Sequence, residues 1–173
     1  MHAPQGRNIA MFRVQFNEQP IIDRLQAAER RLDDPAPMYQ EIGEYVVNAT
    51  KQRFVIGEAP NGSKWAPKSQ VTIDRYKAAG DGSRTKPLIG PSKRLSTEVH
   101  YFFSRAGVEV GSALEYSGVM QGGAAKGAFG TDRSGRPIPW GNIPARVWLG
   151  LSDRDDREIV DIADDYVGEP LDS

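Results

Sequence analysis

Side chains that could perform covalent chemistry are few in this sequence. It has no cysteine, and its two histidines are His2 and His100. A Ser–His–acid triad would have to use His100, yet the Gly-x-Ser-x-Gly turn that exposes a nucleophilic serine does not occur. We therefore expect His100 to be an ordinary strand residue. We predict that the chain has no catalytic residue and is not an enzyme.

Two stretches match ligand-binding loops only in part. Gly122 and Gly127 have the first spacing of a phosphate-binding loop, but Ala128 stands where that loop needs its lysine. The acidic run 153–158 matches a calcium loop in charge alone, because it lacks the glycine and the bidentate glutamate of such loops. Its carboxylates suit the N-terminus of a helix instead. We predict no metal and no cofactor.

Charge is distributed unevenly along the chain. Residues 51–105 carry 11 basic and 4 acidic side chains, whereas residues 151–173 carry 2 and 9. The basic segment could bind phosphate groups, or it could contact the acidic segment of a neighbouring copy. Alternatively, both segments are simply solvated surfaces. Trp65 stands among the basic residues, either as a core anchor or as a platform on which bases stack.

Length and hydropathy favour a single domain. The chain has 173 residues, and its apolar runs are much shorter than the roughly 20 residues of a membrane span. The first residues lack the apolar core of a signal peptide, so we expect a cytoplasmic origin. We assign one domain to residues 9–168 and predict disordered termini at 1–8 and 169–173.

Apolar periodicity predicts the elements of the first part of the chain. Phenylalanine and valine alternate with polar residues over 11–17, which is the period of a strand. A helix is expected from Pro20 to Leu32, where Pro35 and Pro37 stop it. A second amphipathic helix is expected to begin at Pro37.

The middle of the chain is predicted to hold loops, a short helix and a hairpin. Glycine and proline residues between 56 and 69 indicate a loop. Residues 70–79 are expected to form a short polar helix that ends at Gly80. The runs Leu95–Phe103 and Val108–Gly111 are typical of a hairpin.

Residues 117–142 are rich in glycine and poor in apolar side chains. A structureless piece of that length inside a compact domain is usually a functional arm. Its composition buries too little apolar area to offset the cost of ordering its backbone. We predict a flexible arm, mobile or extended in the isolated subunit and ordered by a neighbour, with Tyr116 and Trp140 as anchors.

The last predicted element is an amphipathic helix. Ser152 can cap its N-terminus, acidic residues fill its first turn, and Gly168 and Pro170 are expected to end it. Helices that outnumber the strands without alternating with them favour an α+β fold. We predict an antiparallel sheet of about four strands packed by three or four helices, with long Gly/Pro-rich loops.

Three stretches, in this order, resemble a known family. They are residues 59–69 (APNGSKWAPKS), 88–95 (LIGPSKRL) and 143–152 (IPARVWLGLS). They are similar to segments of the virion morphogenesis and tail completion proteins of tailed bacteriophages, of the Mu-like and P2-like kind. The resemblance covers roughly residues 38–168.

This chain departs from the family pattern at two places. Tyr116 and Gln121 resemble its Tyr…His-Gln-Phe-Gly element, but Met120 replaces the histidine. In the 143–152 stretch, Val147-Trp148 stands where the family has Pro-Phe. We expect this stretch to pin the last helix to the sheet, either as a fold-stabilising corner alone or as a partner contact as well.

The resemblance implies a structural protein of virion assembly. Such a protein acts in the tail or at the head–tail joint, the neck, as a closed ring of identical subunits that we expect to be a hexamer. Its other partners would be phage tail, neck or head-completion proteins, with non-specific contact to DNA in the lumen and no membrane. It would reside in the virion, and in the host cytoplasm during assembly. The alternatives are a DNA-binding accessory protein of packaging or head completion, and a hydrolase.

The residues predicted to form subunit or partner contacts combine aromatic anchors, the corner and the two charged segments. They are Trp65, Leu95, Tyr116, Gln121, Trp140, Arg146 and Trp148, together with Asp161, Asp164 and Asp165 on the acidic side and Arg75, Lys77 and Arg84 on the basic side.

Overall fold

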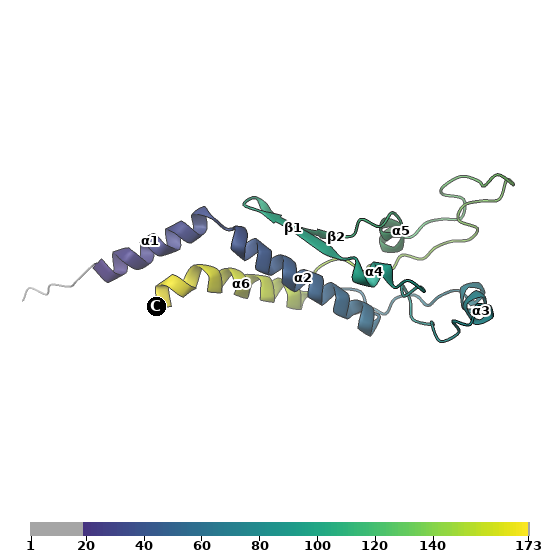
Figure 1. Cartoon of the computed structure of the whole chain (residues 1–173), viewed down its shortest axis with the longest axis horizontal. Coiled ribbons are helices and arrows are strands. Elements are labelled where there is room, and N and C mark those ends of the chain that lie inside the picture. The colour runs from purple at the N-terminus through teal and green to yellow at the C-terminus, as the bar shows by residue number, and fades with distance from the viewer. Residues whose placement is uncertain (1–18, 173) are drawn as a thin grey trace, which may run out of the picture.

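The computed structural model describes residues 19–172, with side chains as far as Gly168. Six helices and one antiparallel hairpin form an elongated structure in this part of the chain (Figure 1). The elements are α1 (Gln19–Asp33), α2 (Ala36–Ile56), α3 (Gln70–Ala78), α4 (Arg94–Thr97), β1 (His100–Ser104), β2 (Gly107–Gly111), α5 (Ser117–Gly122) and α6 (Asp153–Asp172). The predicted α+β class is confirmed.

Helix α2 is the centre of the fold. Pro35 precedes it and Pro37 lies in its first turn, where a missing N–H breaks no helical hydrogen bond. Gly57 ends it with φ at 85°, and the Gly57 N–H donates to the Arg53 carbonyl. Both strands of the hairpin and helix α6 pack along α2 (Figure 1). This helix therefore fixes the position of α6 relative to the rest of the subunit.

The hairpin lies against α2 through one face. Strands β1 and β2 pair with Phe102 opposite Glu109. Tyr101 lies on Gly43 of α2, where a Cβ atom would overlap the tyrosine ring. Phe103 stacks on Tyr101 with ring centres 6.1 Å apart, while Phe102 points outward and is 72% exposed. The close approach of helix and hairpin thus depends on a glycine.

The buried core gathers around the C-terminal half of α2. Phe54 lies with its ring centre 5.2 Å from that of Trp65 and 6.0 Å from that of Trp148. Aliphatic residues complete the cluster: Val47, Ala59, Leu95, Val99 and Leu114. Because aromatic side chains bury the largest areas of any residue type, these three rings tie α2 to the loop after it and to the segment before α6.

Several predicted elements are present with shifted bounds. The helices expected from Pro20, from Pro37 and at 70–79 correspond to α1, α2 and α3. The predicted start of the first hairpin strand at Leu95 is wrong, because residues 94–97 form the short helix α4. Strand β1 begins only at His100.

The described part of the sheet has fewer strands than were predicted for the whole chain. The described residues hold two strands where about four were expected, and six helices where three or four were expected. Two of the additional helices, α4 and α5, are short turns in segments predicted as strand and arm. The predicted strand at 11–17 and the predicted disordered residues 1–8 lie outside the described residues.

The predicted end of the last helix at Gly168 and Pro170 is wrong, because α6 continues to Asp172. A proline has no N–H to donate to the carbonyl four residues earlier, which here belongs to Tyr166. Arg31 of α1 donates to that carbonyl at 2.7 Å, and its guanidinium lies 5.1 Å from the centre of the Tyr166 ring. The packing of α1 on α6 thus satisfies the carbonyl that the proline leaves without a helical donor.

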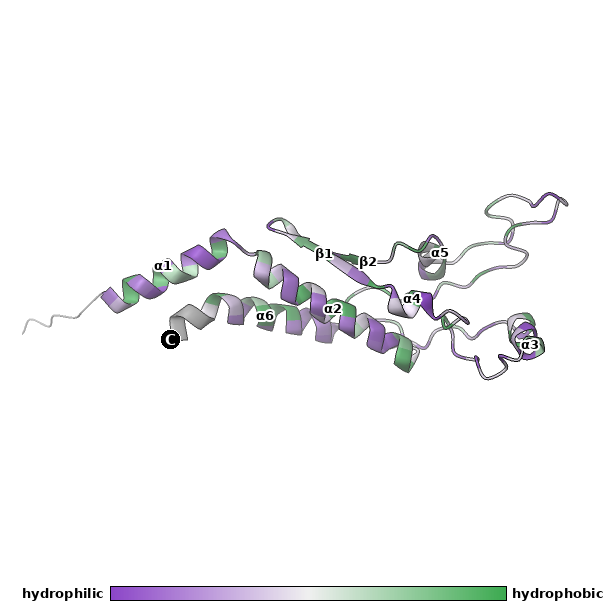
Figure 2. Cartoon of the chain, in the orientation of Figure 1, coloured by the Kyte–Doolittle hydropathy of each residue, from purple (hydrophilic) through white to green (hydrophobic). Residues whose placement is uncertain are grey.

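Apolar residues form stripes along the helices (Figure 2). In α1, Ile21, Leu25 and Leu32 share one helical face and are exposed, whereas Ala28 between them is buried. No helix within residues 19–172 is both long and apolar enough to cross a membrane.

Candidate subunit interface

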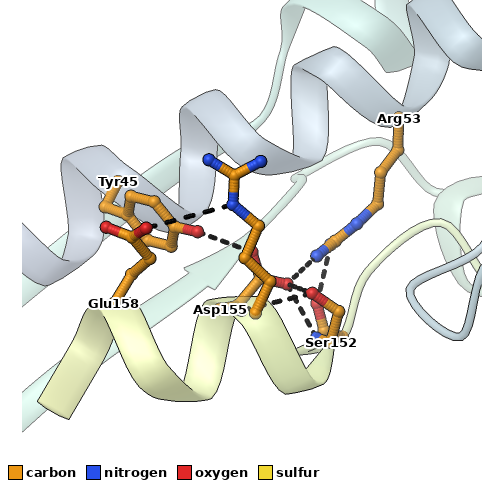
Figure 3. Close-up of polar contacts among 7 residues, drawn as sticks. Tyr45, Arg53, Ser152, Asp155 and Glu158 are labelled. Carbon is orange, nitrogen blue, oxygen red and sulfur yellow. Dashed lines mark hydrogen bonds and ion pairs between the residues drawn. The ribbon is translucent and has the colours of Figure 1, made fainter.

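A buried ion pair fixes the start of α6 to the end of α2 (Figure 3). The Arg53 guanidinium contacts the Asp155 carboxylate, and both side chains are almost wholly buried. The carboxylate also accepts hydrogen bonds from Tyr45 Oη at 2.9 Å and from the Ser152 N–H and Oγ at 2.7 and 2.6 Å. Arg53 Nη1 donates to the Gly150 carbonyl at 2.7 Å. The pair is thus surrounded by partners, as a buried charge requires.

The environment of this cluster shifts the pKa of two of its groups. Burial raises the pKa of Tyr45 to about 12, and the hydrogen bond to Asp155 acts in the same direction. Burial alone would raise the pKa of Asp155, but hydrogen bonds from Ser152 and Tyr45 and the charge of Arg53 outweigh it and hold that pKa below its usual value. Near neutral pH the cluster is therefore a fixed carboxylate with a neutral phenol donor.

The 143–152 stretch is bound by side chains from distant segments. Trp65 Nε1 donates to the Val147 carbonyl at 2.8 Å. The Arg146 guanidinium donates to two carbonyls of the 66–67 segment, at 2.7 and 2.8 Å. Burial lowers the pKa of Arg146. The stretch is a fold-stabilising corner in this subunit, and it leads directly into α6.

Gln121, at the end of α5, completes the corner with three hydrogen bonds. Its Oε1 accepts from the Trp148 and Leu149 N–H groups at 2.9 and 3.1 Å, and its Nε2 donates to the Leu149 carbonyl at 2.7 Å. Gln121→Ala is expected to lower the free energy of unfolding by about 2–3 kcal/mol, because partly buried backbone groups lose their partners. Urea unfolding measures the loss. Gln52→Ala on the exposed side of α2 is the matched control, and an equal effect of both would contradict this role.

Four of the predicted interface residues lie inside the subunit. Trp65, Leu95, Arg146 and Trp148 are each at most 8% exposed. Side chains buried to this degree hold the fold together and do not reach the surface of the subunit. For Trp65 this is the core-anchor alternative that the sequence left open.

The basic lobe, residues 67–92, contains α3 and its flanking loops. Its internal support is Lys68, whose Nζ donates to the carbonyls of Arg84 and Ile89 at 2.6 and 2.7 Å. The same Nζ lies 4.5 Å from the ring centre of Tyr76. Burial and the charge of Arg84 lower the pKa of Lys68. Lys68 is thus a structural cation that organises the lobe.

The three cations predicted on the surface of this lobe differ in their exposure to solvent. Arg75 and Lys77 are exposed on α3. Arg84 is only half-exposed, and its Nε lies 2.8 Å from Asp81 Oδ1. Of these three cations, Arg75 and Lys77 are therefore the ones that face solvent; Lys86 is a further exposed cation of the lobe.

A cavity of about 550 Å³ lies between the basic lobe, α4 and α5. Its lining includes Leu88, Met120 and the exposed Tyr116, which was predicted as an interface residue. Lys68 and Arg146 also line it, but both donate to backbone carbonyls. The third cation that lines the cavity, Arg94, is paired with Glu98, so each of its three cations already has a partner within the chain.

Residues 123–143 form an arm of two antiparallel legs that extends from the body (Figure 1). The legs are joined at the base by paired bonds between Ala124 and Ile143, at 2.9 and 2.7 Å, and farther out by the Phe129 N–H to the Ile138 carbonyl at 2.8 Å. At the base Gly123 has φ at 75°, and a Cβ there would lie 2.7 Å from backbone atoms of the returning leg. The arm is shorter than the predicted 117–142 stretch, whose first residues form α5.

The acidic residues predicted on α6 and the basic residues predicted on α3 lie toward opposite ends of the chain. Asp161, Asp164 and Asp165 are exposed on α6. Figure 1 shows the C-terminal part of α6 beside α1 at one end, and α3 and the arm at the other. The geometry therefore separates the exposed aspartates of α6 from the exposed cations of α3, and the exposed Trp140 belongs to the arm at the α3 end.

Sequence reasoning missed the ion pair that holds α6. The acidic residues at 153–156 were correctly placed in the first turn of a helix, where Asp155 and Ser152 now form a reciprocal cap. Arg53 lies 102 residues earlier in the chain than Asp155. The available signal was a charged residue in the apolar stripe of α2, next to Phe54.

The chain was also compared with known proteins. The phage virion morphogenesis family model matches residues 16–168, which include α1 to α5 and most of α6. No curated protein and no solved structure matches the chain.

Proposed function

The chain belongs to the phage virion morphogenesis family, and on this premise we propose that it completes the tail or the head–tail joint of a tailed phage as a closed ring of identical subunits. A role in phage virion assembly follows from the family itself. In the proposed ring the function lies in surfaces, and the protein catalyses no reaction. A hexamer is the form that the resemblance implies.

The observation that carries the ring is the separation of charge along the subunit. Segment 151–173 has 2 basic and 9 acidic residues, and segment 51–105 has 11 and 4. Because the exposed cations of α3 and the exposed aspartates at 161–165 of α6 lie toward opposite ends, these two groups meet only if different copies associate head to tail. A head-to-tail contact repeated with rotation produces either a ring or an open filament. A joint around a tail axis needs the ring.

The neighbours of such a ring would be other tail, neck or head-completion proteins. The two flat sides of the ring would face these neighbours, while the lumen would admit DNA with at most non-specific contact. The proposed place of the protein is therefore the tail or neck of the virion, reached from the host cytoplasm during assembly.

The mass of the purified protein tests this function. We expect native mass spectrometry to show one closed oligomer, and we expect that oligomer to bind purified tail tubes and to restore infectivity to tails that lack it. A protein that stays monomeric alone and with tail tubes would contradict the proposal.

Exposed cations on the basic lobe favour a second candidate, a DNA-binding accessory of packaging or head completion. Arg75 and Lys77 face solvent, and cations that neutralise phosphates make affinity fall steeply with salt. Titration of duplex DNA at several salt concentrations separates the two functions. A steep salt slope that Arg75→Ala and Lys77→Ala reduce, without any oligomer, would favour the accessory.

The amides of the arm are expected to change protection on assembly. Its hydrogen bonds join two exposed legs and cover little apolar area, so they should exchange rapidly in the isolated subunit. In the assembled particle a neighbour should slow them. Hydrogen exchange with mass spectrometry measures this, with α2 as the slowly exchanging internal reference. Equal protection of the arm in both states would contradict a neighbour contact.

A further inference from the structure

The arm exposes large apolar side chains on a backbone that is already paired. Trp140 is 64% exposed and Phe129 is 56% exposed. The Phe129 and Ile138 N–H groups donate to carbonyls of the opposite leg, each at 2.8 Å. The legs are thus paired within one chain, although exposed hydrogen bonds of this kind open readily and should exchange rapidly until a neighbour covers them. Exposed tryptophans on such a support are typical anchors of protein interfaces.

The far end of the subunit exposes a second apolar surface. Ile21, Leu25 and Leu32 form a stripe along α1, and Leu25 is 57% exposed. Helix α1 is held against α6 by Arg31 and Tyr166. The stripe therefore belongs to a helix that packs on α6, and the exposed acidic residues of α6 lie toward the same end of the chain. We call this combined surface, with Asp161, Asp164 and Asp165, the α1–α6 face.

The charges around the two apolar surfaces are complementary. Lys126, Arg133 and Arg136 are exposed on the arm, and the arm's single acid, Asp132, accepts bonds from the Ser134 and Arg136 N–H groups. In the α1–α6 face, α6 contributes exposed aspartates, whereas α1 has three acidic and three basic residues and adds no net charge. Arm against arm, or acidic face against acidic face, would place like charges together. Each surface therefore suits the other better than it suits itself.

We propose that the arm of one copy docks on the α1–α6 face of the next copy, with Trp140 and Phe129 packing on the Ile21–Leu32 stripe. The proposal rests on the ring proposed above and names its joint. The arm lies at the end of the subunit opposite α1, so the contact forms between copies (Figure 1). Because the two surfaces differ, the contact is heterologous and repeats around a ring.

Site-directed cross-linking tests the joint directly, because the natural chain has no cysteine. Ala128→Cys places a thiol beside Phe129 on the arm, and Glu29→Cys places one beside the stripe of α1; both positions are exposed. A mixture of the two variants with a short bismaleimide should give mixed dimers, whereas neither variant alone should cross-link to itself. Glu109→Cys on β2 is the matched control for Glu29→Cys. Cross-linking of Ala128→Cys to Glu109→Cys at equal yield, or no cross-linking to Glu29→Cys, would overturn the joint.

Substitution of the anchors gives a second measurement. Trp140→Ala and Leu25→Ala should each lower the association constant for assembly, and the loss for Trp140→Ala should be about 30-fold, as for an interface anchor. If the two side chains contact each other, the double variant should lose less affinity than the product of the two single fold-losses. Phe102→Ala removes a ring from the hairpin that is at least as exposed as Trp140, and it should leave assembly unchanged. Both anchors are exposed, so the thermal midpoint should stay the same.

The outcomes separate this joint from the function on which it rests. A wild-type chain that never assembles contradicts the ring itself. A ring that forms equally well with Trp140→Ala contradicts only the arm joint. If Trp140→Ala assembles normally but loses affinity for single-stranded DNA at low salt, the arm stacks on bases and the joint is wrong.

Discussion

Asp155→Ala is expected to lower the free energy of unfolding by about 3–5 kcal/mol, the usual cost of removing one partner of a buried ion pair. The substitution leaves the buried Arg53 guanidinium without its carboxylate, and Ser152 and Tyr45 without their acceptor. For a chain of this size the midpoint of thermal unfolding should fall by roughly 2–4 °C for each kcal/mol. Differential scanning calorimetry measures the change.

Two further variants show whether the loss comes from the unpaired charge. The double variant Arg53→Met with Asp155→Leu removes both charges and should recover most of the stability, apart from roughly 1 kcal/mol for the lost helix cap. Glu158→Ala breaks only an exposed pair with Arg154, at 3.9 Å, and should change stability by less than about 0.5 kcal/mol. A double variant as unstable as Asp155→Ala would show that the hydrogen bonds, not the buried charge, dominate.

Acid should remove this stabilisation. The pKa of Asp155 is lower in the folded chain than its ordinary value, mainly because hydrogen bonds from Ser152 outweigh the effect of burial. Its contribution is therefore complete above the ordinary aspartate pKa and is lost as the pH falls toward the folded value. The difference in stability between wild type and Asp155→Ala should accordingly shrink in that acidic window.

The elements that sequence predicted well are those whose signal is local. The apolar stripe of α2, the proline in its first turn and the β-branched and aromatic runs of the hairpin each lie within one segment. Ser152 and the acidic first turn of α6 likewise act within four residues of one another. These patterns determine local structure without help from distant parts of the chain.

The wrongly predicted element bounds have a common cause, which is contacts between residues far apart in the sequence. Pro170 was expected to stop α6, but the carbonyl that it leaves free is satisfied by Arg31, 135 residues away from Tyr166. Leu95 was expected in a strand, but it is packed in the core by the short helix α4. Neither partner is visible in the local sequence.

The sequence predicted where the charged residues of the candidate interface lie, but it did not predict which aromatic residues are on the surface. Counting charged residues by segment identified the acidic α6 and the basic lobe, because charged side chains are rarely buried. The same logic could not place the tryptophans, since a tryptophan suits a core and an interface equally well. Trp65 and Trp148 belong to the core, and only Trp140 lies on the surface.

Reversing three aspartates of α6 is expected to slow assembly at low salt by at least about tenfold, because charge steers association more than it holds the complex. Asp161→Lys, Asp164→Lys and Asp165→Lys together change segment 151–173, with 2 basic and 9 acidic residues, to 5 and 6. All three side chains are exposed, so the monomer should stay folded. Light scattering after dilution from high salt gives the rate. The difference in assembly rate between the variant and the wild type should become smaller as the salt concentration rises.

Charge reversals of basic residues at the other end, combined with the triple variant, identify which residues the aspartates of α6 contact. Arg75→Glu with Lys77→Glu changes the basic lobe, where Arg84 is omitted because Asp81 already holds it. Arg133→Glu with Arg136→Glu changes the arm. If either pair partly restores the assembly rate of the triple variant, opposite ends of neighbouring copies meet. We expect the arm pair to restore more, because the arm carries the apolar anchors that pack on α1. Recovery with neither pair, or normal assembly of the triple variant, would mean that the two ends do not meet and that the acidic surface of α6 serves another partner or solubility alone.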